Sequence, residues 1–138
     1  MSEWARLHNE IKRRPVEDYL TPSQREARDI ICQTLRFPER VNLTGPYGSG
    51  KTYVAWAVVR ATGALHVPLP EMLSELQPGH EILLIDNAPH VEPDIRRLLA
   101  SANLLGASSV VLITRQPASM PMKRVQLALP SEKEVQGI

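Results

Sequence analysis

Eight consecutive residues in the first half of the chain combine glycine, lysine and threonine in the pattern G-x-x-x-x-G-K-[ST], which is a phosphate-binding P-loop. Glycines accept a positive φ, so successive backbone N–H groups can turn into one concavity that continues into a helix N-terminus. Lys51 would reach the β- and γ-phosphates, and the Thr52 hydroxyl would ligate Mg²⁺. We therefore expect ATP to be bound by this run and the residue after it: Gly45, Pro46, Tyr47, Gly48, Ser49, Gly50, Lys51, Thr52 and Tyr53.

A carboxylate that could share the metal ion follows 34 residues after Thr52. Residues 82–85 are four apolar residues, and Asp86 ends the run, which is the Walker B pattern. An aspartate at the tip of such a strand would lie beside Thr52 and hold Mg²⁺, usually through water. Asp86 and Thr52 are therefore the predicted metal ligands.

Strands and helices alternate in the pattern that must position these residues. The unbroken apolar run before Asp86 is typical of a central strand buried on both faces, and a second such run covers residues 109–114. The alternation predicts an α/β fold with a parallel sheet covered on both faces and a ligand at the carboxyl ends of its strands. We expect strands at 41–44, 64–67, 81–86, 109–114 and 124–129, and helices at 21–35, 53–62, 70–76 and 93–105.

Local signals fix several of these helix ends. Thr21, Pro22 and Gln24 form a capping box with proline at the first helical position, and Ala27, Ile30, Ile31 and Leu35 define the face predicted to be buried. Gly63 and Gly106 follow the ends of two other helices. Trp4, Leu7, His8 and Ile11 have the spacing of a further amphipathic helix over residues 2–13.

Composition limits the classes of function. A chain of 138 residues is large enough for one domain, and a formal net charge of +1 gives no strong electrostatic attraction to DNA or to an anionic membrane. The single cysteine excludes an internal disulfide, and no apolar run reaches the length of a membrane span. We expect a cytoplasmic protein.

Taken together, these motifs resemble the AAA+ and STAND branch of the P-loop ATPases over about residues 41–134. The bacterial replication-initiator ATPases and their shorter regulatory relatives are the most similar by eye. The resemblance implies a three-layer αβα P-loop NTPase core with a roughly five-stranded parallel sheet at 37–138, preceded by an N-terminal helical segment at 1–36 that packs on it. It rests on the segments Leu43–Pro46, His66–Leu69, Ile85–Asn87, Leu112–Pro117 and Leu127–Glu134.

The same resemblance assigns roles at the end of the 109–114 strand. Thr114 would be the sensor-1 residue, whose polar side chain touches the γ-phosphate and the attacking water. Arg115 has two interpretations, a γ-phosphate contact within its own chain or an arginine finger toward a neighbouring subunit. Lys123 and Arg124 are the only basic residues in the short segment where the initiators carry their finger.

The chain departs from the family pattern in two ways. Asn87 takes the position after the Walker B aspartate, where relatives usually have a carboxylate; an amide cannot accept the proton of water, and loss of a general base lowers turnover by on the order of 10²–10⁴-fold. His90, Glu92 and Asp94 are close enough in sequence to replace it. The helical lid of AAA+ proteins has no counterpart before the last residue, and we expect a partner to supply that wall of the site.

Two functions follow as hypotheses. The first is a Mg·ATP-binding switch or assembly subunit whose hydrolysis is slow or depends on a protein partner or self-assembly; Lys51, Asp86, Asn87, Thr114 and Arg115 would carry any catalysis. The second is an active ATPase of the initiator or loader type that acts on DNA or on a DNA-bound partner, against which the near-neutral charge argues mildly.

Overall fold

The computed structural model describes residues 20–129, and the helix expected at 2–13 and the lid-like segment after residue 129 lie outside this range. Nine elements follow one another along the described chain. They are helix α2 (Pro22–Thr34), strand β1 (Arg40–Thr44), helix α3 (Lys51–Thr62), strand β2 (Leu65–Val67), the 3₁₀-helix η2 (Pro70–Glu75), strand β3 (Ile82–Ile85), helix α4 (Glu92–Leu104), and strands β4 (Ser109–Thr114) and β5 (Lys123–Gln126).

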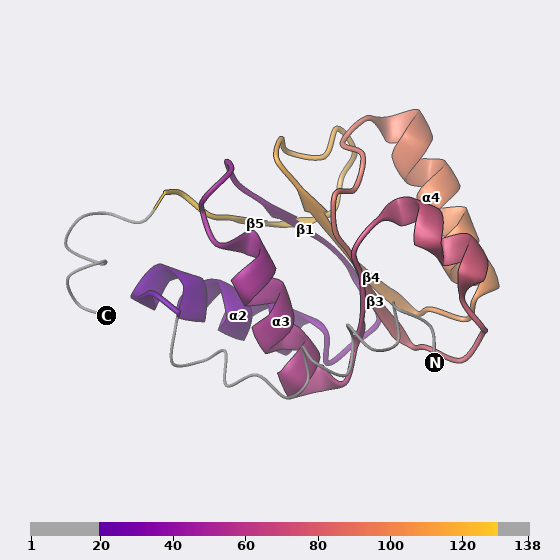
Figure 1. The fold of residues 1–138 in the computed structure, drawn as a ribbon, viewed down its shortest axis with the longest axis horizontal. Coiled ribbons are helices and arrows are strands. Elements are labelled where there is room, and N and C mark those ends of the chain that lie inside the picture. Colours follow the sequence, from indigo (N-terminus) through magenta and orange to yellow (C-terminus); the bar gives the residue numbers. More distant parts are fainter. Residues whose placement is uncertain (1–19, 130–138) are drawn as a thin grey trace.

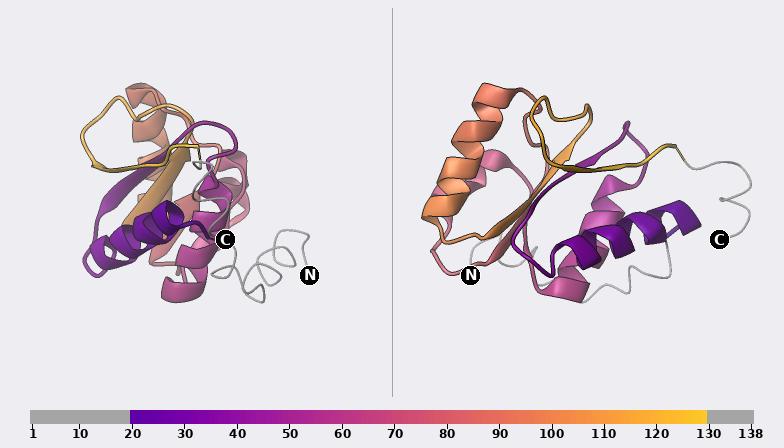
Figure 2. Two further views of the ribbon diagram at one scale, coloured as in Figure 1. Left: turned by 90° about the vertical axis from the view of Figure 1, so that its left-hand side faces the viewer. Right: turned by 180° about the vertical axis from the view of Figure 1, so that it is seen from behind.

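The five strands form one parallel sheet in the order β2-β3-β4-β1-β5, which confirms the predicted α/β fold class. Helices α2 and α3 cover one face of this sheet, and α4 covers the other (Figures 1 and 2). Strand β4 lies between β1, which leads into the P-loop, and β3, which leads to Asp86. The ends of these three strands therefore meet at one edge.

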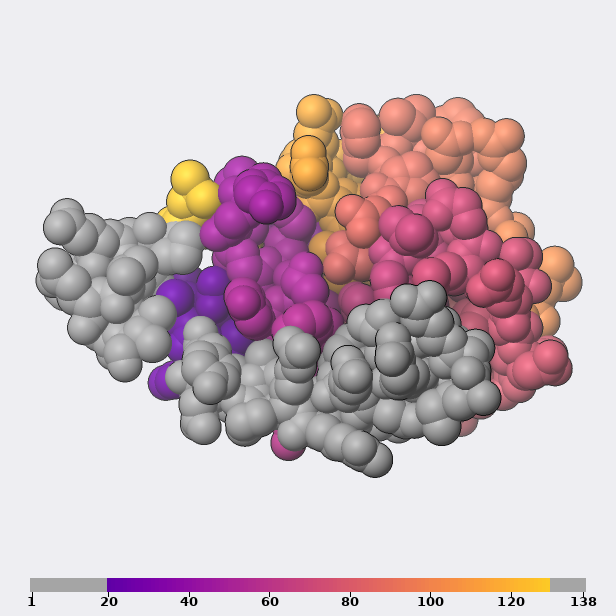
Figure 3. Space-filling model, viewed as in Figure 1, coloured from indigo at the N-terminus to yellow at the C-terminus, as the bar shows by residue number. Residues whose placement is uncertain are grey.

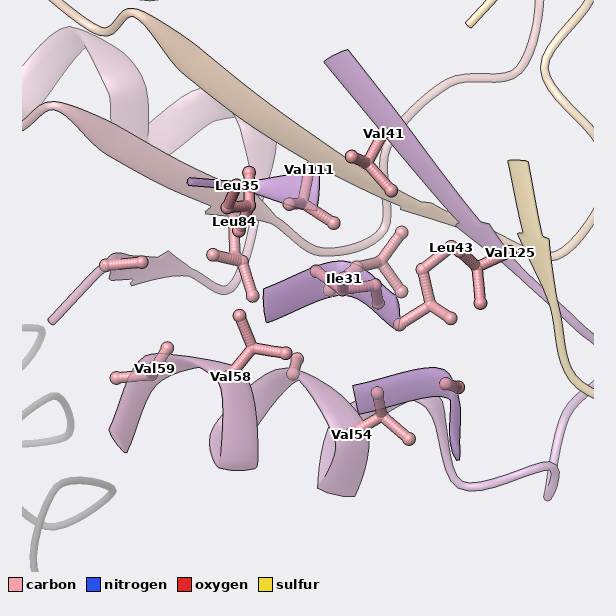
Figure 4. Packing of buried hydrophobic residues seen from close by; sticks show 14 of the residues in the cluster. Ile31, Leu35, Val41, Leu43, Val54, Val58, Val59, Leu84, Val111 and Val125 are labelled. Atoms are coloured by element: carbon pink, nitrogen blue, oxygen red, sulfur yellow. The ribbon is translucent and has the colours of Figure 1, made fainter. Parts of the chain in front are cut away.

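Two hydrophobic clusters hold the layers together, one on each face of the sheet. The first packs Ile31 of α2 and Val54 and Val58 of α3 against residues of β1, β4 and β5 (Figure 4). The second packs Ile95 of α4 and Leu73 of η2 against the opposite face. Because the sheet is covered on both faces, strand β3 is apolar throughout, as the run before Asp86 indicated.

The predicted helix ends are largely confirmed. The capping box is present, since Thr21 Oγ1 accepts from Gln24 N and Gln24 Oε1 accepts from Thr21 N. Gly63 ends α3 with a φ of 74°, in the left-handed region where glycine is favoured. The inward face of α2 is narrower than expected, because Ile30 is 37 % exposed while Ala27, Ile31 and Leu35 are buried.

Most predicted boundaries lie within one residue of those observed, and three elements differ more clearly. Helix α3 begins at Lys51 rather than at residue 53, because the P-loop runs directly into its first turn. The segment at 70–76 is a 3₁₀-helix, Pro70–Glu75, and the last strand ends at Gln126 instead of residue 129.

Candidate functional site

A cavity of about 640 Å³ lies at the carboxyl ends of β1, β3 and β4, where the P-loop meets the loops after β3 and β4. In Figure 3 these segments gather at the upper edge of the molecule, with the P-loop in purple and the loop after β4 in orange. The cavity brings together all five residues predicted to be catalytic. Its lining is Tyr47, Gly48, Gly50, Lys51, Thr52, Tyr53, Asp86, Asn87, Ala88, His90, Ile113, Thr114, Arg115 and Gln116.

Two glycines give the P-loop its shape. Gly48 and Gly50 have φ values of 86° and 89°, a conformation that costs little only for glycine. Gly45 is needed for another reason: a Cβ there would lie 2.7 Å from Ser49 Oγ and 2.8 Å from the Leu127 carbonyl oxygen. Its N–H donates to the Thr114 carbonyl at 3.2 Å, which ties the start of the loop to the end of β4.

The N-terminus of α3 is left open to an anion. Its N-cap, Gly50, supplies no side-chain hydrogen bond, and its first turn holds no acidic residue. By contrast, α2 has a capping box, and α4 has Glu92 and Asp94 in its first turn. Among the described residues no side chain caps this end, so its first N–H groups and the positive end of the helix dipole are available to a bound phosphate.

The P-loop also contains a buried hydroxyl group, that of Ser49. Ser49 is 1 % exposed, and within the described chain its Oγ has no hydrogen-bond partner. Gly45, Pro46 and Ser49 do not line the cavity themselves. The P-loop residues that do line the cavity before Lys51 are Tyr47, Gly48 and Gly50.

The Lys51 ammonium donates to the carbonyl of Gly45 and, at 3.1 Å, to that of Pro46. Burial lowers the pKa of Lys51 below its ordinary value of 10.5; the carboxylate of Asp86 opposes this effect, and the guanidinium of Arg115 adds to it. An ammonium whose charged form is disfavoured in this way gains from an added anion. A phosphate group in the cavity would supply that charge.

Oxygen ligands suited to magnesium meet beside Lys51. Thr52 Oγ1 and Asp86 Oδ2 lie 3.5 Å apart, one on the first turn of α3 and the other after β3. Neighbouring ligands around an octahedral Mg²⁺ at about 2.1 Å are roughly 3 Å apart, so a hydroxyl and a carboxylate at this separation fit a hard cation. Mg²⁺ commonly takes one or two protein ligands and completes its shell with phosphates and water.

Asn87 has a conformation that explains its residue type. Its φ is 52°, and it is the only described non-glycine residue with a positive φ. Asparagine tolerates this left-handed region better than glutamate does. Its Nδ2 donates to the Pro68 carbonyl at 3.0 Å, so the amide links the turn after β3 to the segment after β2.

Thr114 lines the cavity, but its hydroxyl is held by its own chain. It is 2 % exposed, Oγ1 donates to the Gln116 carbonyl at 2.6 Å, and Asn42 Nδ2 donates to it at 2.9 Å. Asn42, fully buried in β1, also donates to the Leu112 carbonyl and accepts from Ala118 N–H. The sensor-1 role of Thr114 stays a prediction, and the observed contacts show it braced by Asn42.

Arg115 lies at the same cavity as Lys51 in its own chain. Its guanidinium is 5.6 Å from the centre of the Tyr47 ring, a cation–π contact that joins the loop after β4 to the P-loop. Arg124, by contrast, donates to the Ala118 carbonyl at 3.0 Å. Both interpretations of Arg115, a contact within its own chain and a finger toward a neighbour, stay predictions.

The candidate replacements for a general base are separated by the structure. His90 lines the cavity. Glu92 instead pairs with Arg96 at 2.6 Å, and Asp94 pairs with Arg97, both on the surface of α4. Asp86 is thus the only Asp or Glu among the described residues that line the cavity.

Three contributors to the site were not predicted from the sequence. Asn42 braces Thr114, and the Gln24 amide, assigned only to a capping box, also donates to the Ser49 carbonyl at 3.0 Å. His66 Nε2 lies 3.5 Å from Asp86 Oδ2. Each of these contacts joins residues at least 20 positions apart, and local sequence patterns do not predict contacts over such a separation.

Comparison with known proteins supports the fold. No protein-family model and no curated protein matches the sequence. Among solved structures, the chain is similar to Bacteroides sp. Pif1 in complex with ADP-AlF4, at 17 % sequence identity and a TM-score of 0.50; the match covers 80 % of this chain and 35 % of that one. The chain therefore spans about a third of this neighbour and has the fold of a P-loop NTPase. Within residues 20–129, no helix combines the length and apolar character needed to span a bilayer.

Proposed function

We propose that the chain binds Mg·ATP in this cavity and acts as a nucleotide-dependent switch or assembly subunit whose hydrolysis is slow or depends on a partner. One observation carries the proposal. The uncapped N-terminus of α3 opens onto a cavity that also holds the Lys51 ammonium and the Thr52–Asp86 oxygen pair. A helix end, a cation and two hard oxygen ligands together match a triphosphate with its metal ion.

Each residue contributes a separate part of the binding. Backbone N–H groups of the P-loop and of the first turn of α3 would donate to phosphate oxygens. Lys51 would exchange its bonds to the Gly45 and Pro46 carbonyls for stronger, charge-assisted bonds to phosphate. Thr52 and Asp86 would hold the magnesium ion, which when bound neutralises charge on the phosphates.

The geometry also supports slow hydrolysis by the chain alone. A base that activates water must lie within hydrogen-bond reach of it, and Asn87 offers only an amide whose nitrogen is bonded to Pro68. Glu92 and Asp94 are paired with arginines on α4. This leaves His90 as the remaining candidate base among the cavity residues outside the Mg²⁺ ligands.

The AAA+ or STAND assignment is the finer part of the proposal. It is supported by strand β4, which lies between the strands that lead to the P-loop and to Asp86 and ends at Thr114, directly before Arg115. Arg115 contacts Tyr47, which is 82 % exposed at the edge of the cavity. An exposed aromatic residue joined to a cavity arginine is suited to report nucleotide state to a protein partner.

Native mass and turnover, measured on the same preparation, test this proposal. We expect turnover well below one per second for the isolated chain, and a native mass that differs between Mg·ATP, Mg·ADP and nucleotide-free samples. Lys51→Ala should abolish that difference, whereas Lys123→Ala, a change at an exposed lysine on β5, should retain it. Turnover of several per second with one unchanging mass would contradict the switch, and DNA binding that falls with salt would favour the loader.

A further inference from the structure

A histidine in the sheet lies against the predicted metal-binding carboxylate. His66 is the middle residue of β2, where it is paired in register with Leu84 of β3, and it is 5 % exposed. Neither of its ring nitrogens has a hydrogen-bond partner among the described residues. Nε2 lies 3.5 Å from Asp86 Oδ2, a separation that a small shift of either side chain would turn into a hydrogen bond.

We propose that His66 is a positioning residue for Asp86, whose carboxylate it holds by an Nε2–H donor in the orientation that binds the magnesium ion of the nucleotide complex. This inference rests on the proposed function of the cavity. His66 does not line the cavity itself, so it would act on the metal ion only through Asp86.

The surroundings of Asp86 show why such a donor matters. Oδ1 accepts from the Asn87 backbone N–H at 2.8 Å, so one oxygen is anchored by the turn. Oδ2 lies 3.5 Å from both Thr52 Oγ1 and His66 Nε2. With Oδ1 anchored, these two groups decide how far the carboxylate plane can rotate. Of these two groups, His66 belongs to strand β2 of the sheet and Thr52 to helix α3.

The backbone keeps His66 and Asp86 in place relative to one another. Asp86 N–H donates to the Val67 carbonyl at 2.8 Å, which continues the β2–β3 ladder one residue past the end of β3. A buried histidine with a purely structural role normally bonds its ring nitrogens within the core. Within residues 20–129 neither nitrogen has such a partner, and the polar group within reach is a predicted metal ligand. Carboxylates that ligate metals are themselves commonly hydrogen-bonded by a surrounding residue.

The test compares magnesium dependence in four proteins: wild type, His66→Phe, His66→Gln and His80→Phe. Phenylalanine fills the same space without a donor, and glutamine restores an N–H donor at similar reach. His80 lies in the loop before β3, outside the cavity lining, and serves as the matched histidine control. The readout is the dissociation constant of a fluorescent ADP analogue, measured in EDTA and across a magnesium series.

For His66→Phe we expect an unchanged dissociation constant in EDTA and a magnesium requirement raised by about 10- to 100-fold, the range found when a residue supporting a metal ligand is lost. His66→Gln should recover most of this loss, and His80→Phe should match wild type. Equal magnesium dependence of His66→Phe and wild type would overturn the inference, as would equal weakening with and without magnesium. Failure of wild type to bind the analogue at all would overturn the proposed function itself.

A second measurement needs neither a variant nor a nucleotide. Nitrogen-15 NMR of the histidine rings in the free wild-type protein reports which ring nitrogen carries the proton. The proposal expects a proton on Nε2 of His66, facing Asp86. A ring protonated only at Nδ1 would contradict it even if His66→Phe failed to fold.

Discussion

Asn87 meets two local demands with one side chain, a positive φ and a hydrogen bond to the Pro68 carbonyl. The sequence-based interpretation considered this residue only for catalysis, at a position where relatives usually have a carboxylate. The backbone gives a second reason for an asparagine, because the turn that carries Asp86 into the cavity needs a residue that tolerates the left-handed region.

The two demands can be separated by substitution. Asn87→Gly should cost about 1 kcal/mol of unfolding free energy, because it loses the side-chain hydrogen bond but keeps the favoured φ. Asn87→Val should cost roughly 2–3 kcal/mol, because a β-branched residue adds the strain of the left-handed conformation. Urea denaturation gives both values, and an equal cost for the two variants would show that φ is unimportant there.

Lys51 predicts how stability changes with pH. Its pKa is lowered in the folded, nucleotide-free protein, chiefly by burial, while the unfolded chain has the ordinary value of 10.5. Between these two values the unfolded chain holds the proton more tightly, so the contribution of Lys51 to stability rises with pH in this window. At pH values below this window Lys51 is protonated in both the folded and the unfolded chain, and the folded protein bears the full cost of burying the charge.

Lys51→Met removes that cost. We expect the nucleotide-free variant to be stabilised relative to wild type at pH 7, and the difference to shrink as pH rises toward 10.5. Urea denaturation of both proteins at pH 7 and pH 10 measures it, and the comparison with wild type cancels the other groups that titrate. A difference that stays constant with pH would count against a lowered pKa.

At the scale of elements, the start of α2 supports both its own helix and the P-loop. Thr21 and Gln24 cap α2, but the Gln24 amide also donates to the Ser49 carbonyl of the P-loop. The capping box was readable from the sequence because its partners are three residues apart. The contact to Ser49 spans 25 residues and depends on how α2 packs beside α3.

Substitutions at these two positions should therefore differ in their effect on function. Thr21→Ala should lower stability by about 1 kcal/mol, the usual cost of a lost N-cap, and leave nucleotide affinity unchanged. Gln24→Ala should lower stability by about 2 kcal/mol and weaken nucleotide binding by roughly 3- to 10-fold, because the Ser49 carbonyl loses its donor. Equal affinity in the two variants would show that Gln24 serves α2 alone.

Asn42 plays a comparable role between strands. Its amide bonds the Leu112 carbonyl, the Thr114 hydroxyl and the Ala118 N–H, so one side chain of β1 braces the end of β4 and the loop that follows. Asn42→Ala should cost about 3 kcal/mol or more, because it leaves buried polar groups unpaired. Thermal or urea denaturation measures this, with the exposed Asn103→Ala of α4 as a control expected to change stability by less than about 0.5 kcal/mol.

At the scale of the whole molecule, local sequence patterns predicted the helices and strands well. The contacts between distant residues became known only from the structure. The apolar run before Asp86, the capping box at Thr21 and the glycine at position 63 each act within a few residues of chain, and each was confirmed. The position of β4 between β1 and β3 depends on pairing between distant strands. The hydrophobic periodicity of the sequence does not specify the order of the strands in the sheet.

The candidate site divides in the same way. The P-loop, Asp86, Thr114 and Arg115 were found from motifs, and the structure brings them to one cavity. The supporting residues Gln24, Asn42 and His66 were missed in this role, because a buried polar side chain in a strand or a cap has the same sequence signal whether or not it supports a site. Only the folded structure shows which residues such a side chain contacts.

The central claim is that this cavity binds Mg·ATP through Lys51, and titration with a fluorescent ATP analogue in the presence of magnesium tests it most directly. Wild type and the Lys123→Ala control should bind alike and saturably. Lys51→Ala should bind about 10- to 100-fold more weakly, because it loses charge-assisted bonds to phosphate. Equal binding by wild type and Lys51→Ala, or no binding by wild type, would contradict the claim.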